Sequence, residues 1–271
     1  MLCNGLLPLF ALVATGLLAC PMRGTPAPDG TVAGHIPARP KQGAGGQAVM
    51  ACVADLSVAD REAILLKEIA AGNLPEFLRV FKSVRVEAMD SAGVHHTAVF
   101  EVMPDYLAVG SDCDFVRTPL TPMTALAIAS GFGCTLPTRK MVDAVYARSE
   151  VKLEPRPLTE SREAVKTFLQ HNAILETQRA GKPLGLLVAG IKKDVVQSVR
   201  LLEKPNRVAI YGWHKLDGSP IQPLTIVHRD TYVDYSHGIR LVRQNMLVDG
   251  KPTTVAAVLA DPKLKFLIID E

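Results

Sequence analysis

The 271-residue chain has few aromatic side chains, little net charge and few cysteines. It contains one Trp, five Tyr, eight Phe and five Cys, and its formal net charge is +3 with Lys and Arg scattered along the sequence. Proteins that bind nucleic acid present a basic stripe or an aromatic stacking platform. Neither pattern is present, so the sequence argues against nucleic acid as a partner. No internal repeat of fixed period occurs.

Charge is absent altogether from the first twenty residues. Leu6 to Ala19 form an apolar run of the length typical of the hydrophobic part of a signal peptide. The run closes on Leu17-Leu18-Ala19-Cys20, which resembles the lipobox of bacterial lipoproteins. This resemblance implies that Cys20 is lipidated and anchors an exported protein to a membrane of the bacterial cell envelope. Because no Lys or Arg precedes the run, a different cleaved signal or an uncleaved anchor stays open as an alternative.

Large apolar side chains are scarce in residues 21–48, which are rich in Pro and Gly. Such a composition cannot bury a core and predicts an extended tether. The remaining residues, 49–271, are enough for one domain with a sizeable core. Three cysteines fall in this domain, namely Cys52, Cys113 and Cys134. An odd number outside the cytoplasm predicts at least one unpaired thiol, and the pairing among the three stays open.

The pattern of the domain predicts an α+β fold, in which a helical N-terminal and middle part packs on a mainly antiparallel β-sheet. Helical periodicity and capping residues indicate helices at 57–71, 122–130, 138–149, 162–176 and 253–259. Alternating or β-rich runs indicate a hairpin of strands 82–89 and 95–103, and further strands at 184–189, 207–213, 224–227, 231–235, 239–248 and 264–269.

Several stretches together resemble a group of uncharacterised exported bacterial proteins of the lipoprotein type. They are PDYLAVGSD at 104–112, CTLPTRKMVD at 134–143, KKDVV at 192–196, GWH at 212–214 and YVDYSHGIRLV at 232–242. The resemblance covers most of the chain from about residue 80 onward and implies no activity. Function has to be argued from the residues themselves.

Residues 208–242 hold three of the seven His, the only Trp and three of the five Tyr. Polar groups concentrated among strand-like residues are costly to bury unless they have a partner or a chemical role. A helical segment that carries a cysteine, followed by strands that supply a histidine, is similar to the order in papain-like murein endopeptidases. By this similarity Cys134 is the nucleophile, His237 is its base, and His228, Asp234 or His214 orients the base. The resulting hypothesis is a cell-envelope hydrolase of peptide or amide bonds, with peptidoglycan as the substrate class and no cofactor.

Two alternatives remain open. In the first, His214, His228 and His237 are zinc ligands, with Asp234 as a fourth ligand or general base. The spacing of Asp234 and His237 is similar to the acid-x-x-His element of D-alanyl-D-alanine metallopeptidases. In a regular strand these two side chains face opposite sides, so they meet only if the strand bends, for example at a bulge near Gly238.

In the second alternative, the domain is a non-catalytic envelope binding or scaffold protein whose core contains His237 as a packed, hydrogen-bonded side chain. For the catalytic hypotheses, other polar and aromatic residues are candidates for substrate binding. They are Trp213, His214, Gln222, Tyr235 and Lys192.

Overall fold

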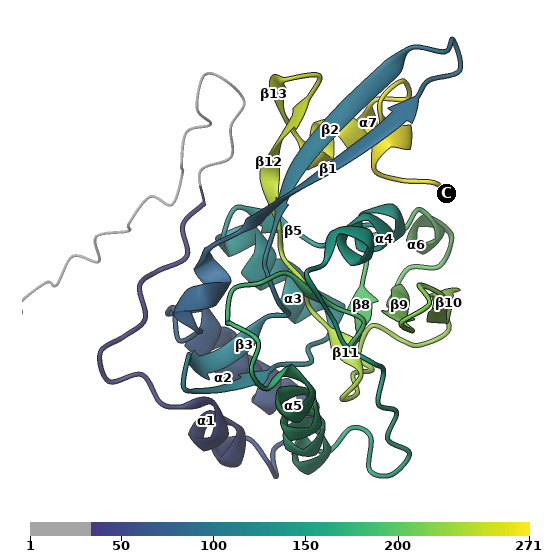
Figure 1. The fold of residues 1–271 in the computed structure, drawn as a ribbon. Coiled ribbons are helices and arrows are strands. Elements are labelled where there is room, and N and C mark those ends of the chain that lie inside the picture. Colours follow the sequence, from purple (N-terminus) through teal and green to yellow (C-terminus); the bar gives the residue numbers. More distant parts are fainter. Residues whose placement is uncertain (1–33) are drawn as a thin grey trace, which may run out of the picture.

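The computed structural model describes residues 34–271 (Figure 1). The expected signal peptide, the lipidation site Cys20 and the first part of the expected tether lie outside the described residues. The rest of the expected tether packs on the domain. Ile36 is buried, and the Arg39 guanidinium donates to the Asn73 side chain and to the Gly110 carbonyl. Contacts with the domain therefore begin before residue 49, where the composition alone places its start.

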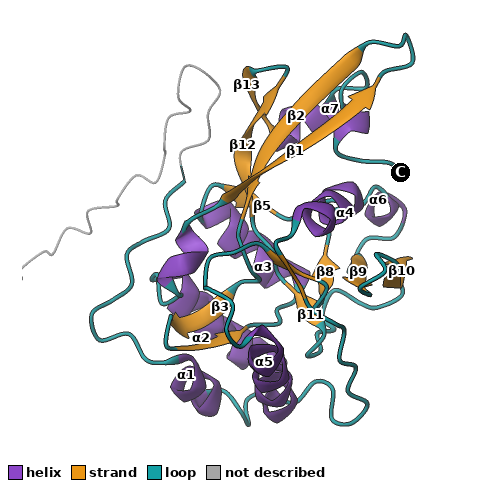
Figure 2. Cartoon of the chain, in the orientation of Figure 1, coloured by secondary structure: helices purple, strands orange, loops and turns teal. Residues whose placement is uncertain are grey.

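Helices lie mainly in the N-terminal half and middle of the described chain (Figure 2). The α-helices are α1 (Gly46–Cys52), α2 (Val58–Ala70), α3 (Pro122–Gly131), α4 (Arg139–Arg148), α5 (Val165–Arg179), α6 (Arg200–Glu203) and α7 (Val255–Ala260), and the short 3-10 helices are η1 (Glu76–Arg79) and η2 (Lys265–Leu267). Side-chain caps begin several of them. Ser57 accepts from the Asp60 amide at α2, and Thr138 accepts from the Met141 amide at α4.

Strands form two larger sheets and two short pairs. The first sheet has the order β1 (Lys82–Met89), β2 (His95–Val102), β12 (Val242–Val248) and β13 (Lys251–Thr254), and β5 (Cys134–Thr135) also pairs with β12. The second has the order β10 (Pro220–Thr225), β9 (Ile210–His214), β8 (Lys193–Val195) and β11 (His237–Gly238). The pairs are β3 (Ala108–Ser111) with β4 (Asp114–Arg117), and β6 (Val151–Lys152) with β7 (Val188–Ala189).

These elements confirm the predicted α+β class. In Figure 1 the β1–β2 hairpin and the β12–β13 hairpin project from one end of the molecule, whereas α1, α2 and α5 lie at the other end. The second sheet lies between these ends and near α5 and α4. The largest hydrophobic cluster joins the N-terminal helices to this second sheet, and a separate cluster packs the projecting hairpins on α4 and on the C-terminal residues.

Two predicted strands are wrong. Residues 231–235 form a turn-rich loop instead of a strand, and residues 264–269 contain η2. The predicted strand at 184–189 shortens to β7 at its end. The β3–β4 hairpin and strand β8 were not predicted.

Candidate active site

The loop of residues 226–236 ends in β11, which carries His237 into the interior. β11 pairs in parallel with β8, and this places His237 opposite Lys193. Gly238 permits the approach, because a Cβ atom there would come within 2.5 Å of the Tyr106 ring and 2.6 Å of the Lys192 Cβ. Asp234 and His237 are joined by a turn, in which the His237 amide donates to the Asp234 carbonyl at 3.1 Å. This turn brings the two residues into the same buried cluster, as the expected bend requires.

The Asp234 carboxylate is saturated with hydrogen bonds. One oxygen accepts from the Ser236 amide at 2.8 Å and from the Ser236 hydroxyl at 2.5 Å. The other accepts from the Arg162 guanidinium at 2.7 and 3.1 Å and from the Tyr232 hydroxyl at 2.9 Å. Burial alone would raise the pKa of Asp234, but the interactions with His237, Ser236 and Arg162 outweigh it and hold that pKa well below its usual range. Asp234 is therefore a fixed negative charge with no lone pair free to act as a base.

The His237 imidazole is buried, and neither of its ring nitrogens has a hydrogen-bond partner among the described residues. Burial lowers the pKa of His237 to about 4, with Lys193, His228 and Lys192 acting in the same direction against the opposing charge of Asp234. The ring packs edge-on against Tyr232, at 5.7 Å between centroids, and Tyr232 stacks on His228 at 4.3 Å. A buried nitrogen without a partner costs about 1–3 kcal/mol. His237 therefore differs from the packed, hydrogen-bonded side chain that the non-catalytic alternative expects. Only a water molecule or a polar group of a ligand can bond to its ring nitrogens, because no described side chain or backbone group does.

Near His237 lies a second group of buried polar side chains, which consists of Lys192, just before β8, His171 of α5 and Trp213 of β9. The Lys192 ammonium donates to the Tyr235 carbonyl, and burial lowers the pKa of Lys192 to about 7. His171, on α5, faces the Tyr235 ring at 4.9 Å and the Trp213 ring at 6.4 Å. Burial also lowers the pKa of His171, so this side chain is neutral at neutral pH. The ring nitrogens of His171 and the indole nitrogen of Trp213 make no hydrogen bond of normal geometry.

Trp213 has an unusual backbone for its size. Its φ is 56°, in the left-handed region, and the preceding Gly212 has a φ of 104°. A bulky aromatic residue in this region is strained by about 1–3 kcal/mol and persists only where the surrounding structure fixes it. The consequence is that the indole ring faces the interior next to His171 and Lys193. Strained backbone of this kind is concentrated at functional sites.

Of the candidate residues expected from the sequence, His237, Asp234, His228, Trp213, Tyr235 and Lys192 come together in this cluster. Three further residues complete it, Arg162, His171 and Lys193. Sequence reasoning did not identify Arg162 and His171, and of the two adjacent lysines it selected Lys192 as the candidate. His171 carried no signal in the sequence beyond being a polar residue on a predicted helix. Lys193 stands next to Lys192 in the KKD stretch, but residue spacing alone cannot say which of the two lysines is buried.

Cys134 lies elsewhere. It is in β5, opposite Arg243 of β12, and thus belongs to the first sheet. The buried thiol faces the Phe132 carbonyl at 3.5 Å, and burial raises the pKa of Cys134 to about 12, with Arg243 and Glu101 as the charged groups that act on it. His237 belongs to the other sheet and interacts with a different set of charges. The geometry therefore gives the Cys134–His237 pairing no support. Cys52 and Cys113 are exposed free thiols.

Of the four expected zinc ligands, His228, Asp234 and His237 lie in the cluster, but His214 does not. His214 Nε2 is hydrogen-bonded to the Asp143 carboxylate at 3.0 Å, and its ring stacks on Tyr146, away from the His228–Tyr232 pair. Gln222 lies on β10, where its amide donates to the Pro223 carbonyl. Across residues 34–271, no group of three His, Cys, Asp or Glu side chains is arranged to hold a metal ion. These residues do not fit the proposed zinc site.

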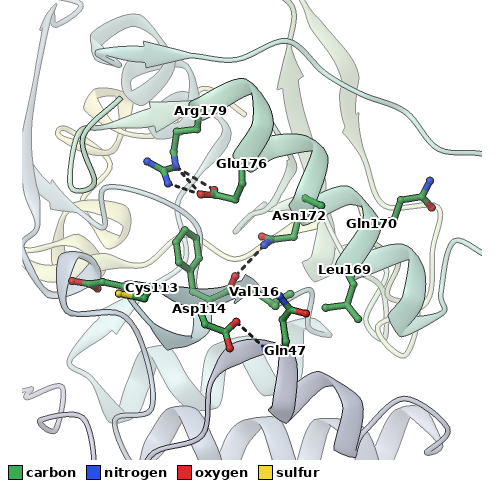
Figure 3. A pocket seen from close by; sticks show the side chains of 12 residues that line it. Gln47, Cys113, Asp114, Val116, Leu169, Gln170, Asn172, Glu176 and Arg179 are labelled. Carbon is green, nitrogen blue, oxygen red and sulfur yellow. Dashed lines mark hydrogen bonds and ion pairs between the residues drawn. The ribbon is translucent and has the colours of Figure 1, made fainter. Parts of the chain in front are cut away.

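A separate cavity of about 580 Å³ lies between α5, the β3–β4 hairpin and the start of α1 (Figure 3). Several of its polar side chains already have partners. Asp114 accepts from the Gln47 amide, Asn172 donates to the Phe115 carbonyl, and Glu176 pairs with Arg179. None of the buried polar atoms that lack a partner belongs to a residue that lines this cavity. We therefore place the candidate site at His237 and not in this cavity.

Comparison with protein-family models, with curated proteins and with solved structures finds no match for this chain. None of the helices in residues 34–271 has the length and apolar character needed to cross a membrane. The resemblances and the lipid anchor expected from the sequence stay predictions.

Proposed function

We propose that this protein is a cell-envelope hydrolase of amide bonds, with peptidoglycan as the substrate class, and that its reaction centre is His237. The observation that carries the proposal is the buried imidazole with two unpaired nitrogens, surrounded by Asp234, Tyr232 and Lys193. A neutral imidazole can take a proton from an attacking water and return it to the leaving amine. The envelope location and the substrate class rest on the N-terminal sequence, as above.

In this proposal each neighbour of His237 has a positioning role. Asp234 fixes the turn through Ser236 and supplies a negative charge that stabilises a protonated His237. The Lys192 ammonium holds the Tyr235 carbonyl and with it the backbone between Asp234 and His237. The half-buried side chains on the outer side of the cluster are Arg162, Lys193, His228 and Tyr232. In this proposal, a substrate reaches His237 at these four residues by displacing solvent and moving some of their side chains.

The test uses the full chain and its His237→Gln variant, with soluble muropeptides as substrate and mass spectrometry of the products. We expect the wild-type protein to release amide-cleavage products and the variant to lose at least about a hundredfold in rate, the usual contribution of a general base. His95→Gln is the matched control, because His95 is an exposed histidine on β2. Cys134→Ala should keep the activity. Equal turnover by wild type and His237→Gln would refute the proposed centre.

The binding-module alternative has one observation in its favour. His237 is only 1% exposed, which is low for a residue that has to reach a polymeric substrate. This alternative predicts that the wild-type protein binds muropeptides without cleaving them, and that His237→Gln weakens the binding. A product in the wild-type reaction that is missing with the variant would exclude it.

A further inference from the structure

Positive charge exceeds negative charge around His237. The charged and titratable groups that face the imidazole are Asp234, Lys192, Lys193, His228 and Tyr232, and Arg162 binds Asp234 from the outer side. Asp234 is the one carboxylate among them, and its oxygens accept from Arg162, Tyr232 and Ser236. Two cations, Arg162 and Lys193, therefore share one carboxylate whose hydrogen-bonding capacity is already used. The half-buried surface at this point attracts an anion.

Lys193 is the cation with unused capacity. Its side chain is half-buried, and its ammonium lies 5.4 Å from the centre of the Trp213 ring. Among residues 34–271 this ring is its only close partner, and no carboxylate or carbonyl oxygen accepts a hydrogen bond from it. An ammonium offers three donors, so Lys193 can take an oxyanion without breaking an existing bond. The β8–β11 ladder sets it opposite His237.

Trp213 supplies a second unpaired donor in the same part of the cluster. Its side chain is 3% exposed, and its indole nitrogen has no hydrogen-bond partner. The same ring contacts Lys193, and the ring's direction depends on the left-handed backbone at Gly212 and Trp213. The indole N–H in the ring plane and the ammonium over the ring face are two donors without an acceptor, a combination suited to a ligand that carries two acceptor oxygens.

We propose that Lys193, together with Arg162 and the Trp213 indole, binds a carboxylate group of the substrate next to His237. This inference rests on the proposed hydrolase function for its substrate class, and it makes that class more specific: an amide whose acyl or amine part bears a free carboxylate close to the bond that is cleaved. The bound carboxylate also offsets the positive charge of Lys193, one of the groups that keep His237 unprotonated. Binding thus makes His237 a stronger base at the moment when substrate is present.

Equilibrium binding tests the inference with two matched probes, N-acetyl-alanyl-alanine and its C-terminal amide. Isothermal titration calorimetry on the full chain should show the acid binding at least about tenfold more tightly than the amide, equivalent to about 1.4 kcal/mol. In Lys193→Met this preference should vanish while the affinity for the amide is unchanged. Lys166→Met, an exposed lysine on α5, is the control and should keep the preference. The ring carbon signals of His237, followed by NMR in a pH titration, should titrate at higher pH with the acid bound than with the amide bound.

Three results would overturn the inference: equal affinity for acid and amide, an acid preference that survives Lys193→Met, or inorganic phosphate that binds more tightly than the acid in a Lys193-dependent way. The last would mean a phosphate ligand. Since the measurement is binding and not turnover, it separates the two proposals. Lack of cleavage by the wild type would refute the hydrolase and leave the binding preference in place. Loss of the preference would refute the carboxylate subsite even if His237 proved essential.

Discussion

Lys192 is a buried cation without a carboxylate partner, so its replacement by methionine should stabilise the protein. The side chain is fully buried, its ammonium donates to the Tyr235 carbonyl, and burial lowers its pKa from 10.5 to about 7, with Arg117 acting in the same direction. In the unfolded chain the lysine is protonated at pH 7 and well solvated. Folding must therefore either release the proton or bury the charge.

The magnitude follows from the difference in pKa. A folded-state pKa about 3.5 below the unfolded one corresponds to a cost of about 4 kcal/mol at pH 7, from about 1.4 kcal/mol for each pKa unit. Methionine removes this cost but leaves the Tyr235 carbonyl without a donor, a penalty of about 1–3 kcal/mol. We expect Lys192→Met to raise the free energy of unfolding by about 1–3 kcal/mol at pH 7.

The pH dependence provides the sharper signature. Because the folded-state pKa is lowered, the stability linked to Lys192 is complete above the unfolded pKa of 10.5 and is lost as the pH falls toward 7. Between pH 7 and pH 9 the wild type should gain about 2 kcal/mol from this group, and Lys192→Met should gain none of it. Urea denaturation at both pH values measures the difference, with Lys166→Met as the exposed control. The same pH dependence in wild type and Lys192→Met would show that Lys192 is not desolvated, and the reasoning would fail.

Three further predictions concern other buried groups. His237 has a folded pKa of about 4, below the ordinary 6.5, so stability should fall by up to about 3 kcal/mol as the pH drops from 6.5 to 4, and His237→Gln should lack this loss in urea titrations. Burial of the Cys134 thiol predicts that native protein reacts with Ellman's reagent only at its exposed cysteines, and fast reaction at Cys134 would contradict this burial. Asp105→Ala should destabilise by about 2–3 kcal/mol in urea, because it removes the carboxylate that the buried Arg117 guanidinium binds at 2.7 and 2.9 Å and leaves Glu176 as its remaining carboxylate partner, and a cost below about 1 kcal/mol would argue against that burial.

Elements with strong local signals were predictable from the sequence. The capping residues Ser57 and Thr138 begin α2 and α4 where the sequence places them, and the alternation of residues 82–103 forms the β1–β2 hairpin. The strand predicted at 231–235 was wrong because of local side-chain hydrogen bonds. Asp234 accepts from the amide and the hydroxyl of Ser236, and the resulting turn competes with a strand ladder. At 264–269 the apolar residues are buried by tertiary packing around η2, with Leu267 and Ile268 in the core, without forming a strand.

The site was predictable in part. The concentration of reactive side chains at 208–242 marked residues that do form a polar cluster, but Arg162 and His171 lie 46 and 37 residues before the start of that segment. Their approach depends on how α5 and the loop before it pack on the second sheet, which no local pattern encodes. Cys134 was singled out by its order along the chain, whereas reactivity depends on burial and on neighbouring charge, and burial disfavours the thiolate more than Arg243 favours it.

The distribution of unpaired polar atoms argues that the cluster is more than packing. Among residues 34–271, five of the eleven buried side-chain nitrogen and oxygen atoms without a hydrogen-bond partner belong to His171, Trp213 and His237. The other six are spread over five residues along the chain, Arg61, Arg79, Asp194, Gln244 and Glu271, whereas Arg117 is an example of a buried charge that is paired, with Asp105. Each unpaired group costs about 1–3 kcal/mol, and apolar side chains of similar shape would remove that cost. These costs are concentrated around Lys192, whose pKa is lowered, Trp213, whose backbone is strained, and Lys193, whose ammonium has no acceptor. The simplest reason for the fold to retain them is that one polar ligand satisfies these groups together.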